Sequence, residues 1–552
     1  MNSYLLFLYI ILSLSCASKT KIDILVYDAI IYTVDSSFSV VEAMAIKDGK
    51  ILATGTSARL LQQFDAKEKL DAKGKYIYPG FIDAHAHFFE YGLGLQTVDL
   101  TGTRGWEECV ERIIKFIAKD SVTKSRYSQK GSWIIGRGWD QNDWIKKDFP
   151  DKEALDLLFK NIPILLTRID GHAAIANQAA LDLAGIGSDT KLTGGDVELK
   201  NGKPTGILID NAIELVTSEI PRNSEKQTEE ALMAAQRNCF AVGLTTIDDC
   251  GLNRPDVELL EKLQKNGALK MRLYVMLSDH PSNYQFLFNR GKIKTDRLHV
   301  RSFKVYADGA LGSRGACLLK PYSDKPAQSG FLLSNKEHFD SVATIIYEKG
   351  FQMCTHAIGD SGNRVVLNTY GSYLKGQNDR RWRIEHAQVV DSADFPLFGR
   401  YSIIPSVQPT HATSDMYWAI DRLGREREKG AYAYNDLLKQ NGWIALGTDF
   451  PVEDISPFKT FYAAVVRKDA AGWPNNGYQV ENALNAENAI RGMTIWAAKS
   501  NFEEHEKGSL ENGKFADFII LDKDILKTAG ADILTIQVLK TYVNGETVYE
   551  KY

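Results

Sequence analysis

Eight short apolar runs, separated by stretches long enough for helices, predict an α/β fold of the (β/α)8 or TIM barrel type. Side chains that can bind a metal follow several of these runs directly. In such barrels the catalytic residues lie at the C-terminal ends of the strands. The pattern therefore predicts the fold and also the end of the barrel that carries the site. The predicted barrel strands are residues 76–85, 243–248, 272–277, 300–306, 351–356, 382–386, 401–407 and 443–449.

Residues 1–18 are predicted to be a secretory signal peptide rather than part of the fold. Residues 4–15 are apolar, end in small residues, and are too short to span a bilayer comfortably. Cys16 follows Leu-Ser-Leu-Ser, which resembles a bacterial lipoprotein processing site. We therefore expect an exported protein that is periplasmic or attached to the membrane through a lipidated Cys16. Ordinary cleavage near Ala17-Ser18 is the alternative, and it also exports the chain.

Both ends of the remaining chain predict β-structure. Residues 22–75 alternate short apolar and polar runs with Asp-Gly and Gly turns between them, and residues 500–552 repeat that style. The interval between the first barrel strand and the one at 243 is far longer than an ordinary barrel connection. We therefore predict an inserted subdomain at about 100–240.

The composition is that of a soluble globular enzyme. Of the 552 residues, 44% are apolar and 25% are charged, and the formal net charge is −4. The sequence has no basic cluster with interleaved aromatic residues, so a nucleic-acid partner is not expected. Five cysteines follow Cys16, scattered and odd in number, so we predict no disulfide framework. The expected partner is a small-molecule substrate, and the sequence does not predict an oligomeric state.

Two histidines at the end of the first predicted barrel strand are the strongest indication of chemistry. Alternate residues of a strand point to the same face, so the rings of His85 and His87 can reach one metal ion. Imidazole nitrogen is a common ligand for several transition metals. By itself the pair also fits two ordinary surface or hydrogen-bonded histidines.

Three further side chains repeat this placement. His356, His386 and Asp449 each follow a short apolar run at once. Taken singly, each histidine also fits a core residue, and Asp449 also fits a loop cap. The same placement in four strands makes a shared metal site the better interpretation.

These residues resemble the ligand set of the amidohydrolase superfamily, whose metal-dependent hydrolases carry such ligands on barrel strands one, five, six and eight. The strings at 168–181 and 303–314 are similar to amidohydrolase family 3, the group of the N-substituted formamide deformylases. The resemblance implies that the two chain ends meet in a small β-sandwich, residues 22–75 and 500–552. It implies a hydrolase barrel over residues 76–499.

Lys304, at the end of the fourth predicted strand, needs a chemical explanation because an ammonium group cannot donate a lone pair to a metal. The resemblance implies that this lysine is carboxylated and that its carbamate bridges two metals. An ammonium in place of the carbamate would add two positive charges to a poorly solvated pocket that already holds divalent ions. The alternative is a salt-bridged surface lysine. We expect one or two divalent ions, in the first place Zn, although Fe, Mn and Ni also suit these ligands.

The expected chemistry is hydrolysis. Such ions make hydroxide available near neutral pH and polarise a carbonyl. Asp449 would take the proton of the attacking water and pass it to the departing amine. We therefore predict hydrolysis of an amide, formamide or cyclic amide C–N bond. A deaminase or an ester or lactone hydrolase on the same site is the alternative, and a non-catalytic exported binding protein is less favoured because every expected ligand position is filled.

Substrate contacts are expected from the predicted insertion and from loops that follow the strands. The candidates are Trp139, Asp170, His172, Asp308, Arg314 and His411. Trp139 also fits the core of the insertion. Arg314 also fits a simple pair with Asp308, and His411 also fits an ordinary loop histidine.

Overall fold

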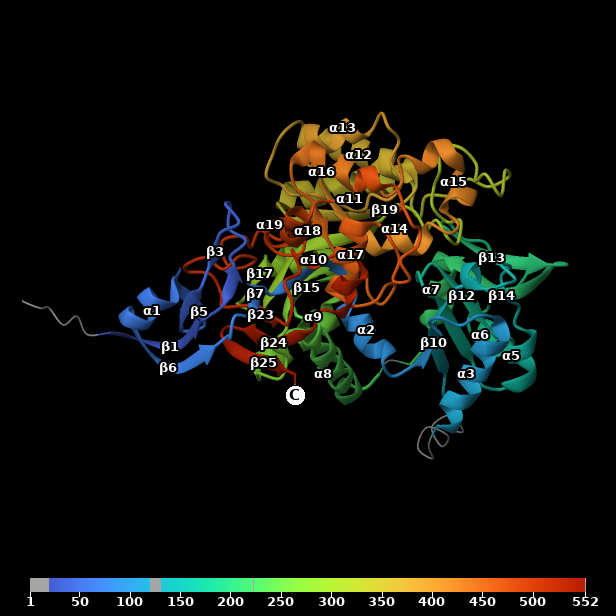
Figure 1. Cartoon of the computed structure of the whole chain (residues 1–552). Helices are drawn as coiled ribbons and strands as arrows, with labels where there is room; N and C mark the ends of the chain where they lie inside the picture. Colours follow the sequence, from blue (N-terminus) through green and yellow to red (C-terminus); the bar gives the residue numbers. More distant parts are fainter. Residues whose placement is uncertain (1–18, 120–130, 222, 552) are drawn as a thin grey trace, which may run out of the picture.

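The computed structural model describes residues 19–119, 131–221 and 223–551 (Figure 1). The predicted signal peptide and Cys16 lie outside the described residues. None of the helices within these three ranges combines the length and the apolar character needed to cross a membrane.

Eight parallel strands, each hydrogen bonded to the next, form the central barrel sheet, with helices packed around it (Figure 1). The strands are β8 (Phe81–Ala86), β15 (Leu244–Leu252), β16 (Arg272–Ser278), β18 (Leu298–Tyr306), β19 (Gln352–Ala357), β20 (Arg383–His386), β21 (Ile404–Val407) and β22 (Ala445–Leu446). A short strand, β17 (Ile293–Lys294), pairs antiparallel with β18. The predicted barrel is confirmed.

The barrel strands are almost uniformly buried because both of their faces are covered, although polar side chains stand among the apolar ones. Helices that follow the strands supply one side of this cover. In α9 (Arg254–Lys265) the side chains of Val257, Leu260 and Leu263 are buried, at the three-residue spacing of one helix face. Larger helices in the same outer layer are α8 (Glu225–Ala241), α10 (Pro281–Arg290), α11 (Lys336–Lys349), α12 (Asp360–Leu374) and α17 (Pro457–Val466).

The segment predicted as one first strand is two strands that belong to different sheets. β7 (Tyr76–Pro79) lies in the sheet of the chain ends, and β8 lies in the barrel. Gly80 separates them, and a Cβ atom there would lie 2.3 Å from the side chain of Thr245. The chain therefore passes from one sheet to the other at a position where only glycine fits.

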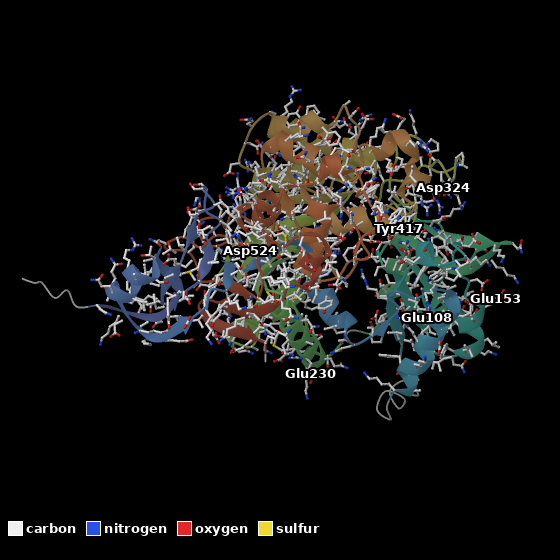
Figure 2. The ribbon with its side chains drawn as sticks, in the orientation of Figure 1. Glu108, Glu153, Glu230, Asp324, Tyr417 and Asp524 are labelled. Carbon is white, nitrogen blue, oxygen red and sulfur yellow. The ribbon has the colours of Figure 1, made fainter. Side chains whose placement is uncertain are left out.

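The two chain ends form a β-sandwich beside the barrel, as predicted. One sheet has the order β5-β4-β1-β6, and the other has the order β25-β24-β23-β7-β2-β3. The strands are β1 (Thr20–Tyr27), β2 (Ile30–Tyr32), β3 (Val40–Val41), β4 (Ala43–Lys47), β5 (Lys50–Gly55), β6 (Phe64–Asp71), β23 (Phe518–Leu521), β24 (Val538–Val543) and β25 (Glu546–Glu550). The hydroxyls of Tyr32 and Tyr78 both donate to Asp524, labelled in Figure 2, at 2.7 Å. Asp524 therefore connects the C-terminal segment with two tyrosines that lie more than 400 positions earlier in the sequence.

The insertion is a separate six-stranded mixed sheet with helices on it, drawn in cyan to green in Figure 1. Its elements are β9 (Val98–Asp99), α3 (Trp106–Ala118), β10 (Ile134–Trp139), α5 (Glu153–Leu158), β11 (Ile164–Arg168), β12 (Ala173–Ala176), α6 (Gln178–Leu183), β13 (Gly195–Lys200), β14 (Lys203–Asp210) and α7 (Asn211–Thr217). Two apolar clusters of its own fill the space between sheet and helices.

The barrel closes where the backbone that follows β22, the last strand, lies against β8, the first strand. Asp449 donates its N–H to the His85 carbonyl at 2.7 Å, and the Asp83 carboxylate accepts from the Thr448 N–H and hydroxyl at 2.9 and 2.6 Å. A Cβ atom on Gly447 would lie 2.5 Å from the His85 nitrogen. The closure therefore depends on a glycine beside a buried carboxylate.

We predict that Gly447→Ala lowers the melting temperature by roughly 2 °C, from about 2 kcal/mol of overpacking at the closure. Scanning calorimetry measures the shift. Gly94→Ala is the matched control, because a Cβ atom at Gly94 meets nothing within 4 Å. An equal effect of both substitutions would contradict the role given to the closure.

Candidate metal centre

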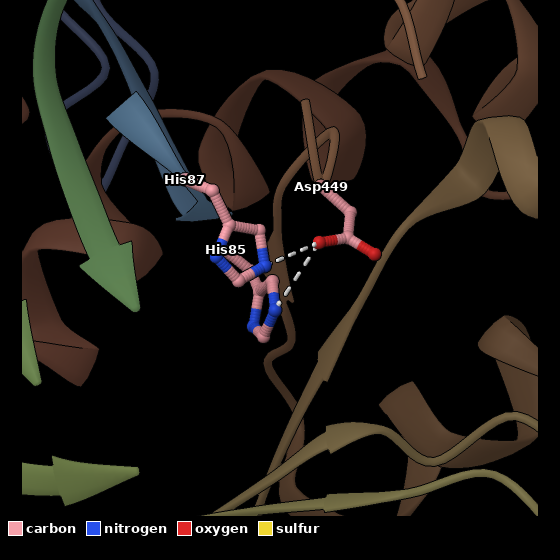
Figure 3. A group of neighbouring side chains, drawn as sticks. All are labelled: His85, His87 and Asp449. Carbon is pink, nitrogen blue, oxygen red and sulfur yellow. Dashed lines mark ion pairs between the residues drawn. The ribbon is translucent and has the colours of Figure 1, made fainter. Parts of the chain in front are cut away.

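Three side chains at one end of the barrel gather into a group with the spacing of metal ligands (Figure 3). The Asp449 Oδ1 atom lies 3.4 Å from His85 Nε2 and 3.2 Å from His87 Nε2. A second group combines Asp449 with His386 and His411, and in each group the potential ligand atoms lie within 4.8 Å of one another. Asp449 therefore stands between two sets of imidazoles.

Each predicted ligand reaches this place because its strand ends there. The register aligns Tyr306 with His356 and Ala357 with His386, so neighbouring parallel strands end at nearly the same height. His386 and Asp449 have positive φ angles of 72° and 63°, which non-glycine residues seldom adopt. Such strained residues are typical of functional sites.

Hydrogen bonds on Nδ1 orient three of the rings. These bonds join His85 to Glu385 Oε2 at 2.6 Å, His87 to the Cys250 carbonyl at 3.1 Å, and His386 to Gln408 Oε1 at 2.7 Å. Because each acceptor holds the Nδ1 proton, the Nε2 lone pair is left for the site.

His356 joins the same set of rings. Its ring centroid lies 4.6 Å from that of His386 and 5.0 Å from that of His172. Its Nε2 atom is buried and has no hydrogen-bond partner among the described residues.

Lys304 points into this group from the fourth strand. Its side chain is buried, and Nζ lies 3.1 Å from His85 Nε2. Within the described part of the chain, Nζ is in no ion pair with a carboxylate, and it lies 5.0 Å from the centroid of the Tyr306 ring. The structure therefore excludes the alternative of a salt-bridged surface lysine.

The donor set fits a divalent metal ion. Imidazole nitrogens and a carboxylate are the ligands that Zn and similar ions take in proteins. His356 Nε2, His411 Nε2 and Asp449 Oδ1 are buried without a hydrogen-bond partner in the described structure. Buried polar atoms are seldom left in that state, and a bound cation would satisfy all three.

Electrostatics keeps these groups in the forms that bind metals. Burial, with a contribution from Lys304, lowers the pKa of His85 to about 4, and burial likewise holds the pKa of His356 and His386 well below the ordinary value. Burial acts to raise the pKa of Asp449, but the close contact of its carboxylate with His87, with contributions from His85 and His386, outweighs burial and keeps that pKa well below its usual range. Neutral rings at His85, His356 and His386 and an ionised Asp449 are the result near neutral pH. Burial acts to lower the pKa of His87 as well, but its contact with Asp449 outweighs burial and raises that pKa.

Among the predicted substrate contacts, the structure brings His411 and His172 to the site. His411 Nε2 lies 3.6 Å from Asp449 Oδ2, and the His411 ring is stacked on His386. His172 comes from the insertion, and its Nδ1 is 2.6 Å from Asp210 Oδ1. Asp170 supports this segment, since it accepts from the His172 backbone N–H at 3.0 Å.

The other three predicted contacts have structural partners. Trp139 is fully buried in the core of the insertion, where its indole donates to the Leu166 carbonyl at 2.8 Å. Asp308 is buried and accepts three backbone N–H bonds, from Cys317, Ile358 and Gly359, and its Oδ1 atom also lies 3.8 Å from His356 Nε2, beside the site. Arg314 pairs with Asp324 at 2.9 Å, not with Asp308. For Trp139 the structure favours the alternative of core packing, because its ring packs against Trp144 and Phe149 within an apolar cluster of the insertion.

Sequence reasoning missed the residues that orient the ligands. Glu385 and Gln408 each hold a predicted ligand, and Asp210 holds His172. Glu385 immediately precedes His386, so its nearness to the site was readable from the sequence. Nothing in the sequence connects Asp210 with His172, because their pairing arises from the antiparallel register of β12 with β14.

A (β/α)8 barrel with buried histidines and an aspartate at its C-terminal end defines the class of metal-dependent hydrolases. The chain belongs to the amidohydrolase family, which it matches over residues 68–549. The resemblance noted in the sequence is thereby confirmed.

Similar proteins support the same class. The chain is 34% identical to the "Protein LONG AFTER FAR-RED 3" of Arabidopsis thaliana, over 96% of this chain and 91% of that protein. It is 26% identical to an N-substituted formamide deformylase of Arthrobacter pascens, over 96% and 98% of the two chains. A solved structure of an uncharacterized metal-dependent hydrolase from Pyrococcus horikoshii superimposes with a TM-score of 0.73 at 28% identity, covering 92% of this chain and 98% of that one.

We predict that removing metal with a chelator lowers the melting temperature and that adding Zn²⁺ restores it. An ion that binds only the folded chain stabilises it by about 3 kcal/mol when its free concentration is a hundred times the Kd. Thermal unfolding with and without the ion measures this shift. The His87→Ala variant should lose the response, and an unchanged melting temperature of the parent protein would count against a metal centre.

Proposed function

We propose that this protein hydrolyses a C–N bond of a small-molecule amide, formamide or cyclic amide, with Asp449 as the group that moves the proton. The observation that carries this proposal is the convergence of His85, His87, His356, His386 and Asp449 from four separated strand ends onto one buried place. The relative that acts on N-substituted formamides supports the choice of an amide bond.

The proposed cofactor is one or two divalent ions, with Zn as the first candidate. The two overlapping groups around Asp449 support room for two ions. We further propose that Lys304 carries a carbamate. Its support is a buried Nζ atom that faces His85 and has no carboxylate partner among the described residues, because an isolated ammonium there would be costly.

The bound ions would supply an ionised water near neutral pH and would polarise the substrate carbonyl. Asp449 Oδ1 faces His85 and His87, whereas Oδ2 faces His411. Asp449 takes the remaining proton of this hydroxide as its oxygen adds to the carbonyl carbon. The same carboxyl group then gives that proton to the nitrogen as the C–N bond breaks, and a carboxylate and an amine are released.

Substrate is held, in this proposal, by side chains that border the six predicted metal-binding residues. His411 lies beside Asp449, and His172 lies beside His356 on the opposite flank. Because His172 belongs to the insertion, the substrate would be enclosed between the barrel and the inserted sheet. Asp170 and Asp210 hold the His172 segment in place.

The test of the function is a substrate panel with purified, metal-loaded protein. We expect turnover of N-formyl, N-acyl or cyclic amides. Faster turnover of esters or lactones, or release of ammonia from an amino-substituted ring, would assign a different reaction to the same centre. Turnover of none of these compounds would contradict the proposal.

Asp449→Asn is predicted to lower kcat by roughly 10²- to 10⁴-fold, the range that proton transfer contributes. Steady-state kinetics measures the loss, and metal analysis of the same sample separates a lost proton carrier from a lost ion. The matched control is Asp454→Asn, a carboxylate further along the same loop that pairs with Lys459. Full activity of the Asp449→Asn variant would exclude the proposed role.

Lys304→Ala is predicted to lose activity and to recover part of it when formate, acetate or propionate is added, because a short carboxylate can replace the carbamate. Activity and bound metal are measured with increasing acid. His356→Ala provides the comparison, since its loss should not respond to the acids. Full metal content in Lys304→Ala without any recovery would argue against the carbamate.

A further inference from the structure

Among the imidazoles predicted to bind metal, His85 is the one whose Nδ1 is hydrogen bonded to a carboxylate. Glu385 Oε2 lies 2.6 Å from that atom. The corresponding acceptors for His87 and His386 are a backbone carbonyl and a side-chain amide oxygen, which carry no charge. Both His85 and Glu385 are completely buried, so water does not screen their interaction.

Glu385 is held in turn by a line of buried charges that crosses the inside of the barrel. Arg383 Nε lies 2.7 Å from Glu385 Oε1, and Arg383 Nη2 donates to Oε2 at 3.0 Å. Arg383 Nη1 donates to Asp248 Oδ2 at 2.8 Å, and Asn501 donates to the other oxygen of Asp248 at 2.5 Å. This chain of buried polar contacts therefore runs from the candidate metal centre through the barrel strands β20 and β15 to Asn501, which precedes the C-terminal strands in sequence.

This arrangement keeps Glu385 ionised. Burial acts to raise its pKa, but Arg383 and His85 outweigh burial and bring the pKa to about 2. A carboxylate on Nδ1 fixes the ring in the tautomer whose Nε2 carries the lone pair, and it makes that nitrogen a stronger donor. Nε2 of His85 is the atom that faces Lys304 and Asp449.

We propose that Glu385 is a positioning residue that sets the metal affinity of the centre through His85. This inference rests on the proposed function, since it requires that His85 binds a metal ion. It differs from a simple structural role, in which Glu385 would only neutralise Arg383 and its loss would change stability but not ion binding.

The chain offers a matched control for these two roles. Glu503 is another buried carboxylate on an imidazole, 3.2 Å from His299 Nδ1, and it pairs with Lys507 at 2.6 Å. Neither His299 nor Glu503 belongs to the candidate metal centre. Glu503→Gln therefore removes a buried charge of the same kind without touching a predicted ligand.

The experiment titrates metal-free full-length protein with Co²⁺, followed by its visible absorption, and with Zn²⁺ in competition. Glu385→Gln should weaken binding about 10- to 100-fold, the range known for partners of ligating histidines, and Glu503→Gln should leave it within about twofold. Equal affinity of Glu385→Gln and the parent protein would overturn the inference. Failure of the parent protein to bind either ion would instead overturn the proposed function.

A second variant covers the case in which Glu385→Gln does not fold, as judged by circular dichroism. Asp248→Asn leaves Glu385 in place but removes the charge that balances Arg383 from the other side. Arg383 then draws more strongly on Glu385, which weakens His85 as a donor. We expect a smaller loss of affinity, about two- to tenfold, and an unchanged affinity in this variant would likewise overturn the inference.

Discussion

The closure of the last barrel strand onto the first is the constraint on which the site depends. Gly447 allows the backbones of the first and last barrel strands to approach. Asp83, on the first strand, accepts hydrogen bonds from the Thr448 N–H and hydroxyl. Because the next residue, Asp449, donates its N–H to the His85 carbonyl, its carboxylate is held beside the rings of His85 and His87. Residues more than 360 positions apart become neighbours through these few backbone bonds.

Charge is distributed around this closure so that the rings of His85, His356 and His386 are neutral and the carboxylates of Glu385 and Asp449 are ionised. Burial disfavours protonation of these three rings, whereas Arg383 keeps Glu385 a carboxylate and the contact with His87 keeps Asp449 one. Each of these groups alone would be expensive to bury. Together they form a buried centre whose ligand atoms can offer lone pairs to a cation, and Lys304 faces this centre without a carboxylate partner among the described residues.

The insertion takes part in this centre and is not simply attached to the barrel. Asp210 has a positive φ of 49°, and a Cβ atom on either Gly309 or Gly315 would lie 2.5 Å from its Oδ2 atom. The carboxylate therefore fits into the loop that follows Lys304 only because both positions are glycine. This contact places His172 against His356, and it gives the Asp-Gly-Ala-Leu-Gly-Ser-Arg-Gly string of the sequence a physical explanation.

The sequence by itself determined the barrel and the approximate place of its strands, and it predicted the residues that gather at their ends, because apolar runs mark buried parallel strands and polar groups follow them. It did not reveal that residues 76–85 serve two sheets, since a glycine crossing between sheets leaves the apolar pattern intact. Nor did it distinguish Trp139, which packs a core, from His172, which reaches the site, because both lie in strings of similar character. Only the tertiary structure decided these points and the pairing of His85 with Glu385, because contacts between distant segments depend on strand register and closure, which local patterns do not encode.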